Sequence, residues 1–128
     1  MATLHTNSST ETINRILAFF TENDRELARS VLAAVLRGVV SQRLVRTKAG
    51  KRTLALEVLM ATPAIRVHIT GNRNHLINQD MKSGGVDGQL TLNQSLVKLV
   101  REDIVDQEIA LMASNDRADL EKALGVFG

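Results

Sequence analysis

Apolar residues recur at helical spacing over the first forty positions, and two helices are predicted there. Ser8 and Glu11 form an S-x-x-E pattern, which is typical of a capped helix start. The apolar positions that follow it are Ile13, Ile16, Leu17 and Phe20. A second helix is predicted from about Glu22 to Val40. Its main apolar stripe consists of Leu27, Val31, Val35 and Val39, with Ala28, Leu32 and Leu36 beside it. A face of this width is typical of a helix that is buried in a core.

The apolar period changes to two in the middle of the chain, which predicts a β-hairpin. Its strands are expected at Arg43–Thr47 and Arg52–Met60, around a turn at Lys48–Lys51. The alternating apolar positions of the second strand are Leu54, Leu56, Val58 and Met60. This alternation is typical of a half-buried strand.

Short capped helices are predicted along the second half of the chain. Thr62 precedes Pro63 at the first helical position, where the missing N–H costs nothing, and Gly71 is expected to end that helix. Thr91 and Gln94 form a second capping box. The apolar positions after it are Leu92, Leu96, Leu99 and Val100. Further helices are expected at about His75–Lys82, Asp106–Ala113 and Asp116–Leu124, with a loop at Gly84, Gly85 and Gly88. The chain is therefore predicted to be α+β, mostly helical, with one β-hairpin.

The composition narrows the class without naming a function. A length of 128 residues suits one compact domain, and the 44% hydrophobic and 23% charged residues are ordinary for a globular protein. Aromatic residues make up only 2% and the net charge is +2, so no nucleic-acid partner is expected. The absence of cysteine rules out disulfides and fits a reducing compartment. No apolar run is long enough for membrane insertion.

The sequence contains no pattern for holding a triphosphate. No G-x-x-x-x-G-K-[ST] loop is present, because Gly84 and Gly85 lack the following Lys and Ser or Thr. No acidic residue ends an apolar strand as a magnesium-holding carboxylate would. We therefore expect no cofactor to bind this chain alone.

Other candidate sites each have a plainer alternative. Five basic residues lie within ten positions, and a solvated hairpin tip is the alternative to a polyanion site. They are Arg43, Arg46, Lys48, Lys51 and Arg52. His68 and His75 match no metal-ligand spacing, so no metal site is expected. His5 lies between a short extended segment and a helix start, where α/β proteins often bind ligands; a histidine in a capped loop is the alternative.

Four segments in order are A-T-L-H-T-N-S, L-R-G-V-V-S-Q-R-L, E-V-L-M-A-T-P-A-I-R and T-L-N-Q-S-L-V-K-L-V. Together they resemble the type IV pilus retraction ATPases of the PilT type, in the secretion ATPase superfamily. The first segment resembles the histidine box of that family. The third of these is similar to the start of the family's A-I-R-N-L-I-R-E retraction motif. Together the segments cover essentially the whole chain.

This resemblance implies a fold, a site and partners. It implies that residues 1–61 form the C-terminal part of a RecA-like nucleotide domain, and residues 62–128 a helical subdomain. His5 takes the role of the box histidine near the γ-phosphate. The retraction motif falls on Ala64, Ile65, Arg66 and Ile69. Family members are hexameric ATPases that use ATP and magnesium in the cytoplasm, peripheral to the inner membrane. Their Walker A loop and Walker B strand precede the histidine box, where this chain begins.

The sequence departs from the family at several positions. Val67-His68 replaces the usual Asn-Leu, Thr70-Gly71 replaces Arg-Glu, and Asp103 stands where relatives often carry Gly. The lack of cysteine favours the retraction branch over relatives with a four-cysteine zinc insert. The resemblance implies a retraction ATPase segment that is inactive alone. The alternative is a protein-binding module that docks on pilus motor ATPase subunits or on the pilus platform protein.

Overall fold

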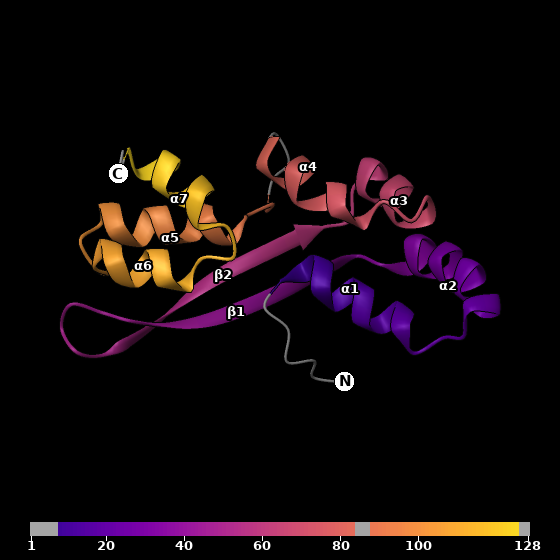
Figure 1. The fold of residues 1–128 in the computed structure, drawn as a ribbon, viewed down its shortest axis with the longest axis horizontal. Helices are drawn as coiled ribbons and strands as arrows, with labels where there is room; N and C mark the ends of the chain where they lie inside the picture. Colours follow the sequence, from indigo (N-terminus) through magenta and orange to yellow (C-terminus); the bar gives the residue numbers. More distant parts are fainter. Residues whose placement is uncertain (1–7, 84–87, 126–128) are drawn as a thin grey trace.

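The computed structural model describes residues 8–83 and 88–125, and it places two groups of helices along one long hairpin (Figure 1). The elements are, in order, α1 (Ser9–Ala18), α2 (Glu22–Val35), β1 (Gly38–Arg46), β2 (Arg52–Met60), α3 (Pro63–Thr70), the 3-10 helix η1 (Asn74–Leu76), α4 (Ile77–Ser83), α5 (Leu92–Arg101), α6 (Gln107–Ala113) and α7 (Arg117–Leu124). The predicted fold class, mostly helical with one hairpin, is confirmed. Among the described residues, no helix is long and apolar enough to cross a bilayer.

The two strands pair antiparallel over their whole length, from Gly38 opposite Met60 to Arg46 opposite Arg52. Gly50 closes the turn with a φ of 80°, a left-handed conformation that glycine adopts without strain. Leu90 adds a short antiparallel bridge to Val58, with N···O distances of 2.8 and 2.9 Å. Leu90, shortly before α5, is therefore fixed to the edge of β2.

The first strand is longer than predicted, and α2 is shorter. The helix ends at Val35, so the predicted helix end at Val40 is wrong. Strand β1 already begins at Gly38, so the predicted strand start at Arg43 is also wrong. A Cβ built on Gly38 would lie 2.8 Å from the carbonyl oxygen of Leu59. This close approach to β2 requires glycine, and β-branched Val39 and Val40 suit the strand that follows it.

The apolar stripe predicted to bury α2 faces outward in the structure. Leu27, Val31 and Val35 are 69%, 54% and 63% exposed. The inward face is instead the neighbouring set, Ala28, Leu32, Ala33 and Leu36. Because α2 lies at one end of the molecule against α1 and α3, only one side of this two-sided apolar helix is covered (Figure 1).

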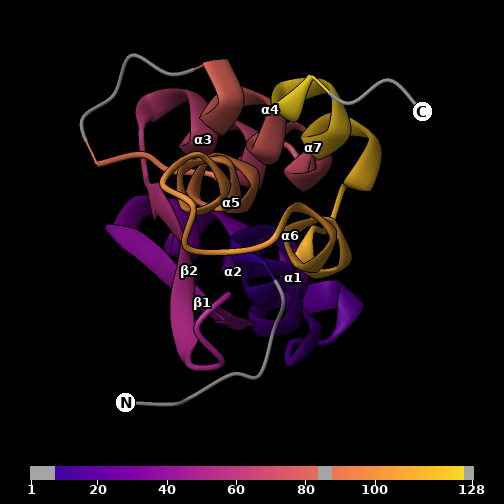
Figure 2. The same cartoon turned by 90° about the vertical axis from the view of Figure 1, so that its left-hand side faces the viewer.

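The hairpin likewise buries the less apolar of its two faces. In β2 the buried positions are Ala55, Glu57 and Leu59, whereas Leu54 and Met60 are 45% and 39% exposed. The helices lie against the first of these faces, which Figure 2 shows from the hairpin tip. The alternation predicts a strand correctly, but it does not tell which face is covered.

The core consists of two clusters. The proximal cluster, around α1 to α4, contains Ile13, Leu17, Ala28, Ala33, Leu59, Ile65, Ile69, Ile77 and Met81. The distal cluster, around α5 to α7, contains Val45, Ala55, Leu92, Leu96, Val105, Ala110, Leu111 and Leu120. Phe20, the last of the apolar positions at helical spacing after Ser8, is 44% exposed. The apolar positions after residue 62 divide between the two clusters, and a domain boundary there stays a prediction.

Local capping agrees with the sequence. Ser8, Thr62 and Asp116 each accept a hydrogen bond from the third residue after them. Thr91 and Gln94 form both hydrogen bonds of the capping box, at 3.1 and 3.0 Å. Asp103 has a φ of 62°, and its carboxylate pairs with the Lys48 ammonium group.

Candidate functional site

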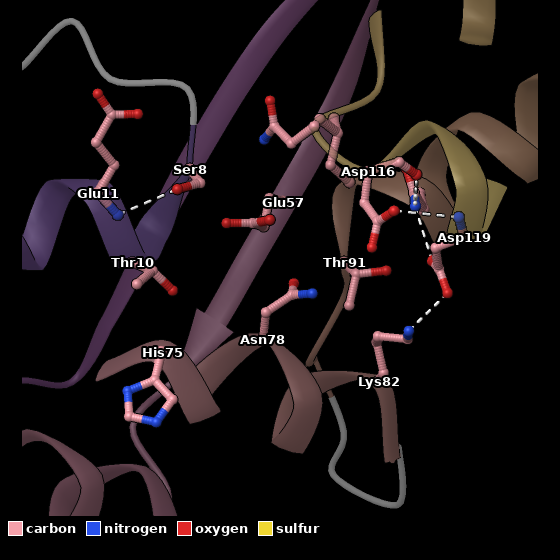
Figure 3. Close-up of a pocket in the computed structure, with 13 residues that line it drawn as sticks. Ser8, Thr10, Glu11, Glu57, His75, Asn78, Lys82, Thr91, Asp116 and Asp119 are labelled. Carbon is pink, nitrogen blue, oxygen red and sulfur yellow. Dashed lines mark hydrogen bonds and ion pairs between the residues drawn. The ribbon is translucent and has the colours of Figure 1, made fainter. Parts of the chain in front are cut away.

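A cavity of about 350 Å³ lies between the two clusters and is lined by five separate parts of the chain. Figure 3 shows the start of α1, the middle of β2, the η1–α4 segment, Thr91 before α5, and the α6–α7 connection around it. Its volume falls within the range of small-molecule sites. Four carboxylates line it, with Lys82 as the one ammonium group; the four are Glu11, Glu57, Asp116 and Asp119.

Glu57 is the most buried carboxylate of this cavity, with only 5% of its surface exposed. The backbone N–H of Ser9, in the first turn of α1, donates to Glu57 Oε1 at 2.6 Å. The partial positive charge of a helix N-terminus stabilises such an anion. Glu57 therefore ties the hairpin to the helix that follows the predicted histidine box.

Lys82 and Asp119 close one side of the cavity with an ion pair of 2.6 Å between α4 and α7. Asn93 also donates to Asp119, at 2.8 Å. The hydrogen bond from Lys82, and then that from Asn93, hold the pKa of Asp119 below its ordinary value. The same bond to Asp119 raises the pKa of Lys82.

The two histidines of the described residues do not share a site. His5 lies outside the described residues. His75 is exposed at the edge of the cavity, whereas His68 Nε2 lies 2.5 Å from Asp80 Oδ2, which connects α3 to α4. Within residues 8–83 and 88–125, no group of three or more His, Cys, Asp or Glu residues could hold a metal ion.

The predicted retraction motif divides between core and surface. Ile65 and Ile69 are fully buried in the proximal cluster. Arg66 donates through Nη1 to the carbonyl oxygen of Ala33, near the end of α2. Ala64 is exposed, and Val67, a departure from the family pattern, is 58% exposed. Any contact with a partner at this motif would therefore involve Ala64 and Val67 more than the two isoleucines.

The basic run is only partly a solvated tip. Arg43 donates to the carbonyl oxygen of Ala113, and Lys48 pairs with Asp103. Both contacts fasten the hairpin to the distal helices. Arg46 and Arg52 are exposed and lie directly opposite one another across the strands, with Lys51 beside them. Two basic residues of the run thus serve the fold.

Sequence reasoning missed Glu57. The signal was present, since Glu57 is a lone acid at an inward position between Ala55 and Leu59 in an otherwise apolar strand. A charge at such a position needs a partner.

The comparisons with known proteins agree with this fold. The sequence profile of the family described as "Type II/IV secretion system protein" matches residues 1–120. The chain therefore belongs to that family. Among its relatives are a "Twitching motility protein" of Neisseria gonorrhoeae, 38% identical over 109 residues, and the "Type IV pilus retractation ATPase PilT" of Pseudomonas aeruginosa, 34% identical over 108 residues. Each alignment covers 84% of this chain.

A solved structure supports the same placement. The crystal structure of the pilus retraction motor PilT with bound ADP matches 93% of this chain with a TM-score of 0.82 and 38% identity. The chain is thus similar to secretion ATPases of the PilT type, and its fold is that of a fragment of a RecA-like ATPase. It spans only 29% and 31% of the lengths of the two curated relatives, and 33% of the PilT chain. The ATPase DotB of Legionella pneumophila, at 17% identity and a TM-score of 0.67, shares the fold.

Proposed function

We propose that this chain is a segment of a hexameric type IV pilus retraction ATPase, the motor of twitching motility. The observation that carries the proposal is the match to PilT over 93% of the chain at a TM-score of 0.82. The motor would act in the cytoplasm, at the inner membrane, with other motor subunits or the pilus platform protein as partners. His5 would respond to the γ-phosphate, and Ala64, Ile65, Arg66 and Ile69 would form the retraction motif.

As a separate polypeptide of 128 residues, the chain is proposed not to hydrolyse ATP. Its sequence contains neither a G-x-x-x-x-G-K-[ST] loop nor an acid at the end of an apolar strand. A backbone cradle, a lysine and a held magnesium ion together stabilise the charge of a phosphoryl-transfer transition state. ATP and magnesium would bind where such parts are supplied together with this segment.

A chimera tests the proposal directly. This chain replaces the corresponding segment of the Pseudomonas aeruginosa PilT, within which 108 residues align. We expect the chimera to hydrolyse ATP and to restore twitching, whereas His5→Ala lowers both. Glu26→Gln, at an exposed position of α2, is the matched control and leaves both unchanged. An assembled chimera that neither hydrolyses ATP nor restores twitching rejects the proposal, as does magnesium-dependent turnover by the purified 128-residue chain.

A second candidate function is a protein-binding module that docks on an intact retraction ATPase. The exposed apolar face of α2, at Leu27, Val31 and Val35, favours it, since apolar patches of this kind mark interaction sites. The test is expression in a piliated host beside a Leu27→Ser, Val31→Ser variant, whose changes lie on this face and are expected to weaken both effects. We expect the unchanged chain to reduce twitching and to co-purify with the host motor. If it does neither, the docking function is rejected.

A further inference from the structure

We infer that the cavity between the two clusters is a binding site for a guanidinium group. The first argument is charge. Four carboxylates and one ammonium group line the cavity, although the chain as a whole carries a net charge of +2. Glu11 pairs with Arg15 and Asp119 with Lys82, and Glu57 and Asp116 supply the remaining negative charge. The ligand of such a site is a cation.

The second argument is the state of Glu57. Its Oε1 accepts from the Ser9 N–H, and among the described residues no partner contacts Oε2. The side chain lines the cavity while only 5% of the residue is exposed. A buried carboxylate is costly unless its lone pairs are used, so the free oxygen is a strong acceptor that faces the cavity. The start of α1 stabilises this charge through Oε1, and no group of residues 8–83 or 88–125 donates to Oε2.

The other acceptors lie on different elements around the same space (Figure 3). Asp116 uses Oδ1 to cap α7, which leaves Oδ2 for a ligand. Thr91 is 3% exposed, and its hydroxyl oxygen, which also accepts from the Gln94 N–H, and the Asn78 side chain add neutral oxygens from the other walls. Asp119 already accepts hydrogen bonds from Lys82 and Asn93. It therefore attracts a cation through its negative charge more than through a direct hydrogen bond.

The arrangement of these acceptors selects the kind of cation. A metal ion needs several ligands around one point, and the described residues contain no such group of His, Cys, Asp or Glu. A guanidinium carries five N–H donors in a rigid plane and can bond to acceptors on separate walls at once. Its planar fork also matches a carboxylate oxygen pair. An arginine side chain of a protein and a small free guanidine would present this same chemistry.

A titration of the 128-residue chain with agmatine, an alkyl guanidinium, tests the inference. Butylurea is its neutral analogue of similar shape. We expect the amide NMR signals of Ser9 and Thr91 to shift with agmatine, with a dissociation constant of about 1 mM, and not with butylurea. Equal shifts with both compounds, or none with agmatine, overturn the inference.

Isosteric variants locate the site. Glu57→Gln keeps an acceptor for Ser9 but removes the charge, and we expect agmatine to bind at least about tenfold more weakly. Asp116→Asn keeps the helix cap and is expected to weaken binding severalfold; it decides the matter if Glu57→Gln does not fold. Glu26→Gln is the control and leaves the affinity unchanged. Unchanged affinity in both cavity variants overturns the inference.

A capped Gly-Arg-Gly peptide distinguishes the two sources of a guanidinium group, which are an arginine side chain of a protein and a small free guanidine. Binding at least as tight as that of agmatine supports a protein side chain as the natural ligand. Exclusion of the peptide while agmatine binds supports a free guanidine. Both results support the guanidinium site.

Discussion

The proximal and distal clusters share one hairpin but differ in how far their own helices cover them. In the distal cluster, α5, α6 and α7 contact one another, and Asn93 joins their ends through Ser114 Oγ at 2.6 Å and Asp119 at 2.8 Å. In the proximal cluster, α2 covers the core with its alanine-rich side and presents Leu27 and Val31 to solvent. Exposed apolar side chains on a helix are unfavourable in water. We therefore expect this side of α2 to be the place where further protein would pack.

The largest expected effect on stability comes from truncating one buried side chain in each core cluster. Leu96 and Ile69 are both 0% exposed, one in each cluster. We expect Leu96→Ala and Ile69→Ala each to lower the free energy of unfolding by about 3 kcal/mol. Denaturant unfolding measures the loss, and native-state hydrogen exchange shows where protection falls. If the clusters are separate cooperative units, Leu96→Ala lowers the hydrogen-exchange protection of amides in α5 to α7 only. The same pattern of lost protection in both variants contradicts that separation.

A smaller effect is expected where the hairpin meets α2. The Cβ in Gly38→Ala would lie 2.8 Å from the Leu59 oxygen, so the strands must shift. We expect a loss of about 2 kcal/mol, which is typical of overpacking, with the proximal cluster losing protection first. Arg37→Ala, at the exposed preceding position, is the control. A neutral Gly38→Ala would show that β1 can begin after residue 38.

The ion pair that links the two clusters is expected to contribute less. Lys82 and Asp119 are 42% and 24% exposed, so solvent weakens the pair, and Asp119→Asn is expected to cost about 1 kcal/mol at neutral pH. Because the pKa of Asp119 is lowered on folding, this contribution is present above about pH 4 and is lost as the pH falls through the lowered pKa. Because the pKa of Lys82 is raised, the contribution is present below about pH 10 and is lost as the pH rises through the raised value. Denaturant unfolding of the unchanged chain and of Asp119→Asn measures the difference in their free energies of unfolding at each pH. This difference should become smaller at low and at high pH. A difference that does not change with pH contradicts this account.

The smallest effect on stability is expected on the exposed face of α2. Leu27→Ser with Val31→Ser should change the free energy of unfolding by less than about 0.5 kcal/mol, because neither side chain packs in the core. Sedimentation velocity should nonetheless show that the unchanged chain self-associates and that the double variant does not. Ala28→Ser, on the buried side, should give the opposite result: lower stability with association retained. An unchanged chain that stays monomeric at high concentration contradicts the role given to this face.

Features that depend on a few neighbouring residues could be predicted from the sequence. The caps at Ser8, Thr62, Thr91 and Asp116 were correct, and so was the turn at Gly50. The reason is physical, since a cap satisfies backbone N–H groups only three residues away. Thr91 and Gln94, at the start of α5, form both hydrogen bonds of the predicted capping box.

Features that depend on distant contacts could not be predicted in this way. Leu27 and Ala28 are neighbours on one helix, and the positions of α1 and α3 decide that Ala28 faces inward. In the same way, the helices beside β2 decide that Ala55 and Leu59 are buried while Leu54 is not. Glu57 shows this for the site, because its partner is a backbone group 48 positions away.

The sequence by itself determined the order of elements, their caps, the hairpin and the family to which the chain belongs. The tertiary structure decided where α2 ends, which faces are covered, and that five segments surround an acidic cavity with Glu57 buried within it. The periodicity of a helix or strand records that a face is apolar, but burial requires a second surface against it. That second surface is supplied by residues far away in the sequence, and their placement depends on the packing of the whole chain.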